Sequence, residues 1–170
     1  MKAPLCEIWI CAKTGVLCPS CESKLSKGEI TELDVKVSRI LYEMAKEHPI
    51  IDKITFLRAF QGKRIIVLMV EKGDVGPLVG RGGRIVRELS RKLKKEKVRI
   101  VGKREMKQMI QDLIIPARLL GVNVLYLPGG KEKYRVRIPK EDRKKIPAQK
   151  EELEKIMREM FSSEFEIRFE

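Results

Sequence analysis

The sequence predicts an α+β protein, in which a small cysteine-rich segment precedes two tandem modules of the order αββααβ. Three observations lead to this fold class. All four cysteines lie within the first 21 residues. Between residues 30 and 103, runs of apolar residues with helical spacing and with strand spacing follow one another in the order αββααβ. The same order recurs, with one gap, over residues 104–170. We therefore expect three segments: 1–28, 30–103 and 104–170.

Composition and charge limit the classes of function. Hydrophobic residues make up 43% of the 170 residues, which is enough for a core. No apolar run approaches the ~20 residues of a membrane-spanning helix, and the first residues do not fit a secretory signal, so we expect a cytoplasmic protein. Lys and Arg total 37 against 24 Asp and Glu, a formal charge of +13, which favours nucleic acid as the partner. A single histidine, His48, leaves little room for acid–base catalysis.

The positive charge is concentrated in the middle of the chain. Residues 31–103 hold 18 basic and 9 acidic residues, which accounts for +9 of the +13. Residues 81–103 alone hold ten basic residues: Arg81, Arg84, Arg87, Arg91, Lys92, Lys94, Lys95, Lys97, Arg99 and Lys103. A solvated helix face is the plain interpretation of such a run. Its position beside a glycine-rich loop favours a binding surface instead.

The cysteine spacing predicts a structural zinc site. The ligand set is Cys6-x4-Cys11-x6-Cys18-x2-Cys21. Four thiolates so close in sequence can converge on one tetrahedral ion, and Cys-x2-Cys is the usual half-site of a structural zinc knuckle. Cys18-Pro19-Ser20-Cys21 also fits a redox motif, and an iron–sulfur cluster remains open. Ile8, Trp9 and Ile10 are expected to pack the knuckle against the rest of the chain, with base stacking by Trp9 as the alternative.

The first module begins with a capped helix. Thr31-x-x-Asp34 resembles a capping box, and an apolar stripe follows from Leu33 to Met44, ending before Pro49. The further elements expected are strands over 51–60 and 64–70, a short helix over 74–79, a basic helix over 84–95 and a strand over 97–101.

Gly80-Arg81-Gly82-Gly83 lies between the two later helices of this module. Glycines allow a tight turn and let backbone N–H groups approach phosphates without an intervening Cβ. The second helix also begins there, with the positive end of its dipole. Termination of a helix is the alternative, although one glycine is enough for that.

In this setting the loop resembles the GxxG loop of a type II KH domain, which clamps the backbone of about four nucleotides. The stretch from Val75 to Arg84, with Glu88-Leu89 and the segment 96–101, is similar to the KH region of the bacterial transcription factor NusA and closer still to its short archaeal relatives. The resemblance implies a non-enzymatic protein that binds single-stranded RNA in transcription elongation or termination, near RNA polymerase. By the same resemblance the RNA-binding residues are Gly80, Arg81, Gly82, Gly83, Arg84 and Arg87.

The second module departs from this pattern at its loop. Leu153, Met157 and Phe161 align with the apolar stripe of the first module's basic helix, yet Ala148-Gln149-Lys150-Glu151 replaces the glycines. We therefore expect a degenerate KH-like module that does not clamp RNA in this way. By resemblance to tandem KH proteins, residues 113–117 form the joint of a rigid two-module body.

Other functions stay open. The same residues suit a ribosome-associated or RNA-processing or decay factor. Binding of single-stranded DNA is a further possibility. An enzyme is disfavoured by the single histidine, the lack of clustered Asp and the lack of a Walker loop.

Overall fold

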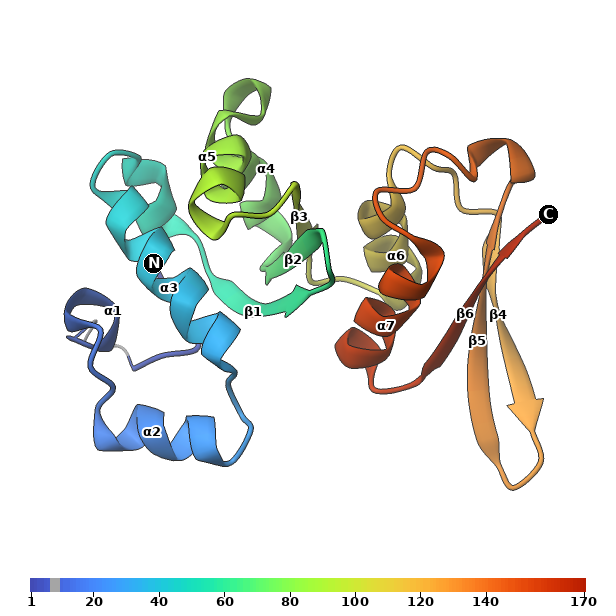
Figure 1. Cartoon of the computed structure of the whole chain (residues 1–170), viewed down its shortest axis with the longest axis horizontal. Coiled ribbons are helices and arrows are strands. Elements are labelled where there is room, and N and C mark those ends of the chain that lie inside the picture. The colour runs from blue at the N-terminus through green and yellow to red at the C-terminus, as the bar shows by residue number, and fades with distance from the viewer. Residues whose placement is uncertain (7–9) are drawn as a thin grey trace. The chain divides into compact units, whose positions relative to one another are not determined.

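The computed structural model describes residues 1–6 and 10–170. The chain divides into two compact units, residues 1–59 with 67–103, and residues 60–66 with 104–170 (Figure 1). Each unit has a three-stranded sheet, of strand order β1-β2-β3 in one and β4-β5-β6 in the other. The protein is thus α+β, and residues 60–66, which form the β1–β2 hairpin turn and the adjoining ends of both strands, group with the second unit.

The helices and strands from the N-terminus to residue 103 are α1 (Ile10–Thr14), α2 (Pro19–Ser26), α3 (Glu32–Ala45), β1 (Phe56–Gln61), β2 (Ile65–Val70), α4 (Val75–Val79), α5 (Arg84–Leu93) and β3 (Lys97–Gly102), with 3-10 turns η1 (Pro49–Lys53), η2 (Lys72–Asp74) and η3 (Arg81–Gly83). From α3 onward the order is αββααβ, as the apolar pattern predicts. Helices α4 and α5 both contact β3.

Helix α3 is tied to the sheet by one carboxylate. The predicted capping box is confirmed, because the Asp34 backbone N–H donates to Thr31 Oγ1 and Asp34 Oδ2 accepts from the Thr31 N–H. The other carboxylate oxygen, Oδ1, accepts from the Ala59 N–H on β1 at 2.7 Å. Asp34 is fully buried, so a single charged side chain both starts α3 and fixes it to β1.

One predicted strand begins later than the apolar run suggests. Residues 49–53 form the turn η1, and β1 starts only at Phe56. Pro49 is the reason, because its fixed φ suits the first position of a helical turn and it cannot donate to a ladder.

The second unit contains α6 (Met106–Ile114), β4 (Gly121–Leu127), β5 (Lys131–Ile138), η4 (Lys140–Asp142), α7 (Lys150–Phe161) and β6 (Glu164–Phe169). Strand β4 pairs antiparallel with β5, in the register Val122 to Val136, and β5 pairs parallel with β6, in the register Val136 to Ile167. Helices α6 and α7 lie on the same side of this sheet (Figure 1).

The expected repeat of αββααβ is wrong in one element of this unit. Where the first unit has α4, the second has only the 3-10 turn η4 and an irregular segment up to α7. Pro147 explains the difference, because proline disfavours the helical conformation of the residue before it.

Within the described part of the chain, no helix has both the length and the apolar character needed to cross a bilayer.

Candidate nucleic-acid interface and metal centre

The glycine loop between α4 and α5 has a backbone that only glycine adopts easily. Gly80, Gly82 and Gly83 have φ values of 78°, 61° and 76°. Gly80 is also packed tightly, because a Cβ there would lie 2.8 Å from the Cγ1 atom and 3.0 Å from the backbone N of Ile85. A Cβ on Gly82 would meet no atom within 4 Å. Gly80 therefore builds the turn, whereas Gly82 presents an open backbone surface.

Cations surround the start of α5. Arg81, Arg84 and Arg87 are exposed. The guanidinium of Arg87 lies back over the loop, since its Nη1 atom is 4.0 Å from the position of a Cβ on Gly83. Helix α5 has no side-chain cap and no acidic residue in its first turn. The unpaired N–H groups of a helix start carry partial positive charge, so cations here raise an already positive potential. Such a place favours an anion.

The inner face of α5 holds the helix in position. Ile85, Leu89 and Leu93 are buried, as the apolar stripe predicts. A contact that the sequence did not indicate comes from His48, whose Nε2 atom lies 2.7 Å from Glu88 Oε2. Both side chains are largely buried, so the only histidine ties the turn after α3 to the middle of α5. The contact therefore links this turn to the helix that carries the arginines.

The aligned position in the second unit has a different geometry. Helix α7 starts at Lys150, after Gln149 with a φ of −64°. Residues 148–151 include no residue with positive φ. The backbone of this segment therefore does not reproduce the turn at residues 80–83.

All four cysteines come together. The sulfurs of Cys6, Cys11, Cys18 and Cys21 lie within 4.8 Å of one another, and none forms a disulfide. Around a zinc ion with Zn–S bonds of about 2.3 Å, tetrahedral geometry sets the sulfurs roughly 3.8 Å apart. The Cys6 and Cys11 sulfurs lie 3.4 Å apart, close to that spacing. Four cysteines in this arrangement could hold a metal ion.

Backbone N–H groups point at these sulfurs. The N–H of Cys6 donates to Cys21 Sγ at 3.2 Å, and that of Cys18 to Cys11 Sγ at 3.1 Å. The Cys21 N–H donates to the sulfur of Cys18, the N-cap of α2, and lowers the pKa of that thiol to about 7. Burial raises the pKa of Cys21 to about 12 and also raises that of Cys11. Donors of this kind stabilise thiolates, the form in which cysteine binds metal.

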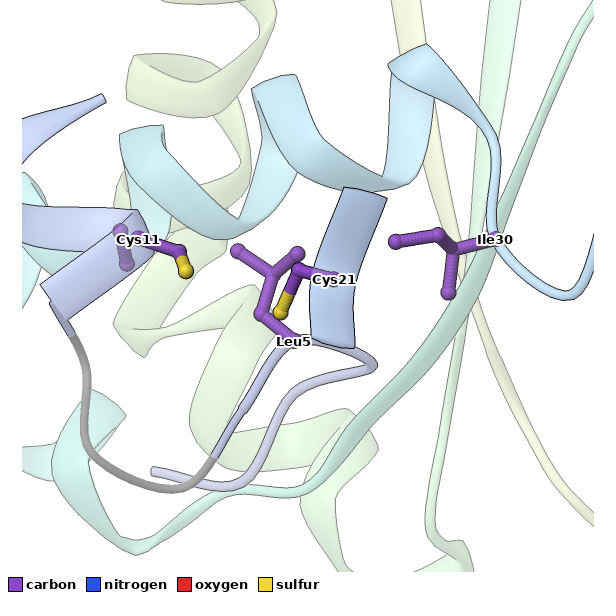
Figure 2. Packing of buried hydrophobic residues seen from close by; sticks show 5 residues of the cluster. Leu5, Cys11, Cys21 and Ile30 are labelled. Carbon is purple, nitrogen blue, oxygen red and sulfur yellow. The ribbon is translucent and has the colours of Figure 1, made fainter. Parts of the chain in front are cut away.

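A small apolar cluster supports the cysteines. Its buried members are Leu5, Cys11, Ala12, Cys21 and Ile30 (Figure 2). Val35 and Tyr42 of α3 pack against it, so the cysteine segment rests on that helix. The expected packing role of Ile8, Trp9 and Ile10 is not found at Ile10, whose side chain is 52% exposed. Ile8 and Trp9 lie outside the described residues.

Comparison with known proteins finds one family model that matches the part of the chain holding this loop. Residues 22–103 match the model of the NusA-like first KH domain. The match spans just under half of the chain and contains the glycine loop, while the four cysteines lie before it. KH domains are in general non-enzymatic RNA-binding modules, so the match suggests nucleic-acid binding. We call the matched residues, 22–103, the KH region.

The fold comparison extends beyond the KH region. The chain is similar to the solved structure of APE1850, with a TM-score of 0.55 and 19% identity, covering 75% of this chain and 96% of that one. At this identity the likeness concerns the fold alone. No curated protein sequence matches the chain significantly.

Proposed function

We propose that the protein holds single-stranded RNA through the glycine loop of its KH region. The observation that carries the proposal is the loop itself, three positive-φ glycines at an uncapped helix start, within residues that match the NusA-like first KH domain. The proposed RNA-binding residues are Gly80, Arg81, Gly82, Gly83, Arg84 and Arg87.

The physical basis is recognition of the phosphate backbone. Because Gly82 has no side chain and no neighbour within 4 Å of a Cβ position, a phosphate can approach its backbone closely. The exposed Arg81 and Arg84 flank that position, and guanidinium groups bind phosphate through paired N–H donors. Such a clamp spans about four nucleotides.

The cysteine cluster is proposed to be a structural zinc site with Cys6, Cys11, Cys18 and Cys21 as ligands. Its support is the all-sulfur donor set, the short distances between sulfurs and the N–H donors that stabilise thiolates. A site closed by four protein ligands leaves no position for a reacting water, so this ion would fold the segment rather than catalyse. The segments 1–28, 30–103 and 104–170 remain the proposed domains.

The proposed cellular role is transcription elongation or termination in the cytoplasm, where the protein would hold RNA near RNA polymerase. It rests on the NusA-like character of the KH region. A ribosome-associated or RNA-processing role would use the same clamp. Purification of the tagged protein under mild conditions separates the two: co-purification with RNA polymerase supports the first role, and co-sedimentation with ribosomes supports the second.

The experiment for RNA binding is fluorescence anisotropy with a tetranucleotide RNA pool. The test variant is Arg81→Asp/Gly82→Asp, since Asp tolerates the left-handed conformation and meets open space at residue 82. The matched control is Gly130→Asp/Lys131→Asp, at the last residue of the β4–β5 turn and the first of β5, where the glycine also has positive φ and a Cβ would meet no atom within 4 Å. Both variants change the net charge equally.

We expect the loop variant to bind the pool about tenfold more weakly or worse, and the control to bind like the wild type. Equal affinities of all three proteins would refute the proposed clamp.

A further inference from the structure

A second basic site lies on the first unit, at the cysteine segment. A pocket of about 440 Å³ is formed by α1, α3 and α5. The buried Ala12 and the half-buried Ile40 give it an apolar base. Four exposed cations from these three helices line it: Lys13, Lys36, Arg39 and Lys92.

The charges in this pocket are not balanced. Among residues 1–6 and 10–170, none of the four cations forms an ion pair. The single carboxylate of the lining, Glu43, lies 3.4 Å from Lys46, a cation outside the pocket. Converging like charges repel one another and raise the local positive potential. A pocket of this kind is suited to a bound anion.

The cysteine segment helps to build the pocket. Gly15 follows α1 with a φ of +76°, and a Cβ there would lie only 2.6 Å from Arg39 Nη2. The guanidinium of Arg39 therefore packs directly against the Gly15 backbone. Helix α1 also carries Cys11 next to Ala12 and Lys13. The segment that gathers the four sulfurs thus holds one wall of the pocket and orients one of its cations.

A single-stranded RNA that leaves the glycine loop can reach the pocket. Lys92 follows Arg84 by eight residues on α5, which is roughly 12 Å along the axis at about 1.5 Å per residue. A stacked strand advances about 3.4 Å per nucleotide, so roughly four nucleotides cover this distance. An RNA longer than the proposed clamp can therefore contact both places.

We propose that this pocket is a second phosphate subsite for the same single-stranded RNA, and that the cysteine segment serves to complete it. The inference rests on the proposed function, because the ligand is the RNA held by the glycine loop. It assigns RNA contacts to Lys13, Lys36, Arg39 and Lys92, outside the loop.

The test compares RNA pools of 4 and 12 nucleotides. The pocket variant is Lys13→Glu/Lys36→Glu, which leaves Arg39 and its packing against Gly15 in place. The matched control is Lys107→Glu/Lys144→Glu, an equal charge change at exposed lysines of the second unit. Circular dichroism checks that each variant is folded. If the reversal unfolds the segment, Lys13→Gln/Lys36→Gln replaces it.

We expect the pocket variant to lose about tenfold affinity for the 12-nucleotide pool, and to bind the 4-nucleotide pool like the control. For the longer RNA, the slope of the logarithm of the binding constant against the logarithm of the salt concentration should become shallower by roughly 1.4. Two phosphate contacts are lost, and each contributes about 0.7 to the slope on a single strand. Equal affinity of pocket variant and control for the longer RNA would overturn the inference. The Arg81→Asp/Gly82→Asp variant distinguishes failure of the clamp from failure of the pocket. Wild-type affinity of that variant for the 4-nucleotide pool refutes the clamp. The pocket is tested separately, by the affinity of the Lys13→Glu/Lys36→Glu variant for the 12-nucleotide pool.

Discussion

Alanine substitutions at Gly80 and Gly82 should differ in their cost to stability, because Gly80 is tightly packed and Gly82 is not. Gly80→Ala puts a Cβ 2.8 Å from the Ile85 side chain, with backbone angles of 78° and 169° that are essentially restricted to glycine. Such a conformation costs about 1–3 kcal/mol, and the overlap adds about 1–3 kcal/mol. Gly82→Ala adopts the left-handed helical region in open space, which costs about 1–2 kcal/mol.

We therefore expect Gly80→Ala to destabilise α5 more than Gly82→Ala, by about 2.5 kcal/mol at the midpoints of these ranges. Native-state hydrogen exchange at the amide of Leu89, a buried residue of α5, measures the free energy of opening of this helix directly. Wild type and both variants are compared in the full chain. Equal lowering of the opening free energy by both alanine variants, or a larger loss in Gly82→Ala, would mean that the contact of residue 80 with Ile85 does not matter for the stability of α5.

Three further predictions concern buried polar groups and metal. Asp34→Asn should destabilise the first unit by about 1–3 kcal/mol in urea unfolding, because an amide cannot accept from both the Thr31 and Ala59 N–H groups. The purified protein should retain one metal ion per chain in elemental analysis, and Cys11→Ser should lower that content and speed exchange across residues 10–26. Arg118 and Lys145 hold the pKa of Asp142 well below its usual range. The stability that this carboxylate contributes is thus present above about pH 4 and is lost as the pH falls further. In Asp142→Asn, the free energy of unfolding should therefore decrease less steeply below about pH 4 than in the wild type.

Each of these has an outcome that contradicts it. Wild-type stability of Asp34→Asn would mean that the link from α3 to β1 is not made. A metal-free protein with reactive thiols or a disulfide would remove the metal site. If the free energy of unfolding falls equally steeply below about pH 4 in wild type and Asp142→Asn, the Arg118 contact does not stabilise the second unit.

Much of the fold is predictable from local pattern. The helix expected at the start of the second module is found over residues 106–114, because apolar residues recur there at helical spacing and Met109, Ile110 and Leu113 are buried. The capping box at Thr31 marks the start of α3 for the same reason, since its hydrogen bonds are local. The start of β1 and the missing helix before α7 were not predicted, because prolines at 49 and 147 outweigh an apolar run or a repeat alignment.

The glycine loop could be located from the sequence, because glycine spacing reports backbone conformation directly. The supporting contacts could not. The Asp34 bond to Ala59 spans 25 residues and the His48 contact with Glu88 spans 40, and nothing in the local sequence pairs them. The basic pocket was missed for the same reason: its cations come from three helices that are separated in sequence. The packing of Arg39 against Gly15 is visible only once α1 and α3 are in place.

The most direct test of RNA binding at the loop is amide chemical-shift mapping of the full chain during titration with a tetranucleotide RNA. We expect the largest changes on residues 80–87 and little change at residues 148–151 of the second unit. RNA binding at the loop is contradicted if the loop amides stay unmoved while the RNA binds elsewhere on the chain, or if no amide responds at all.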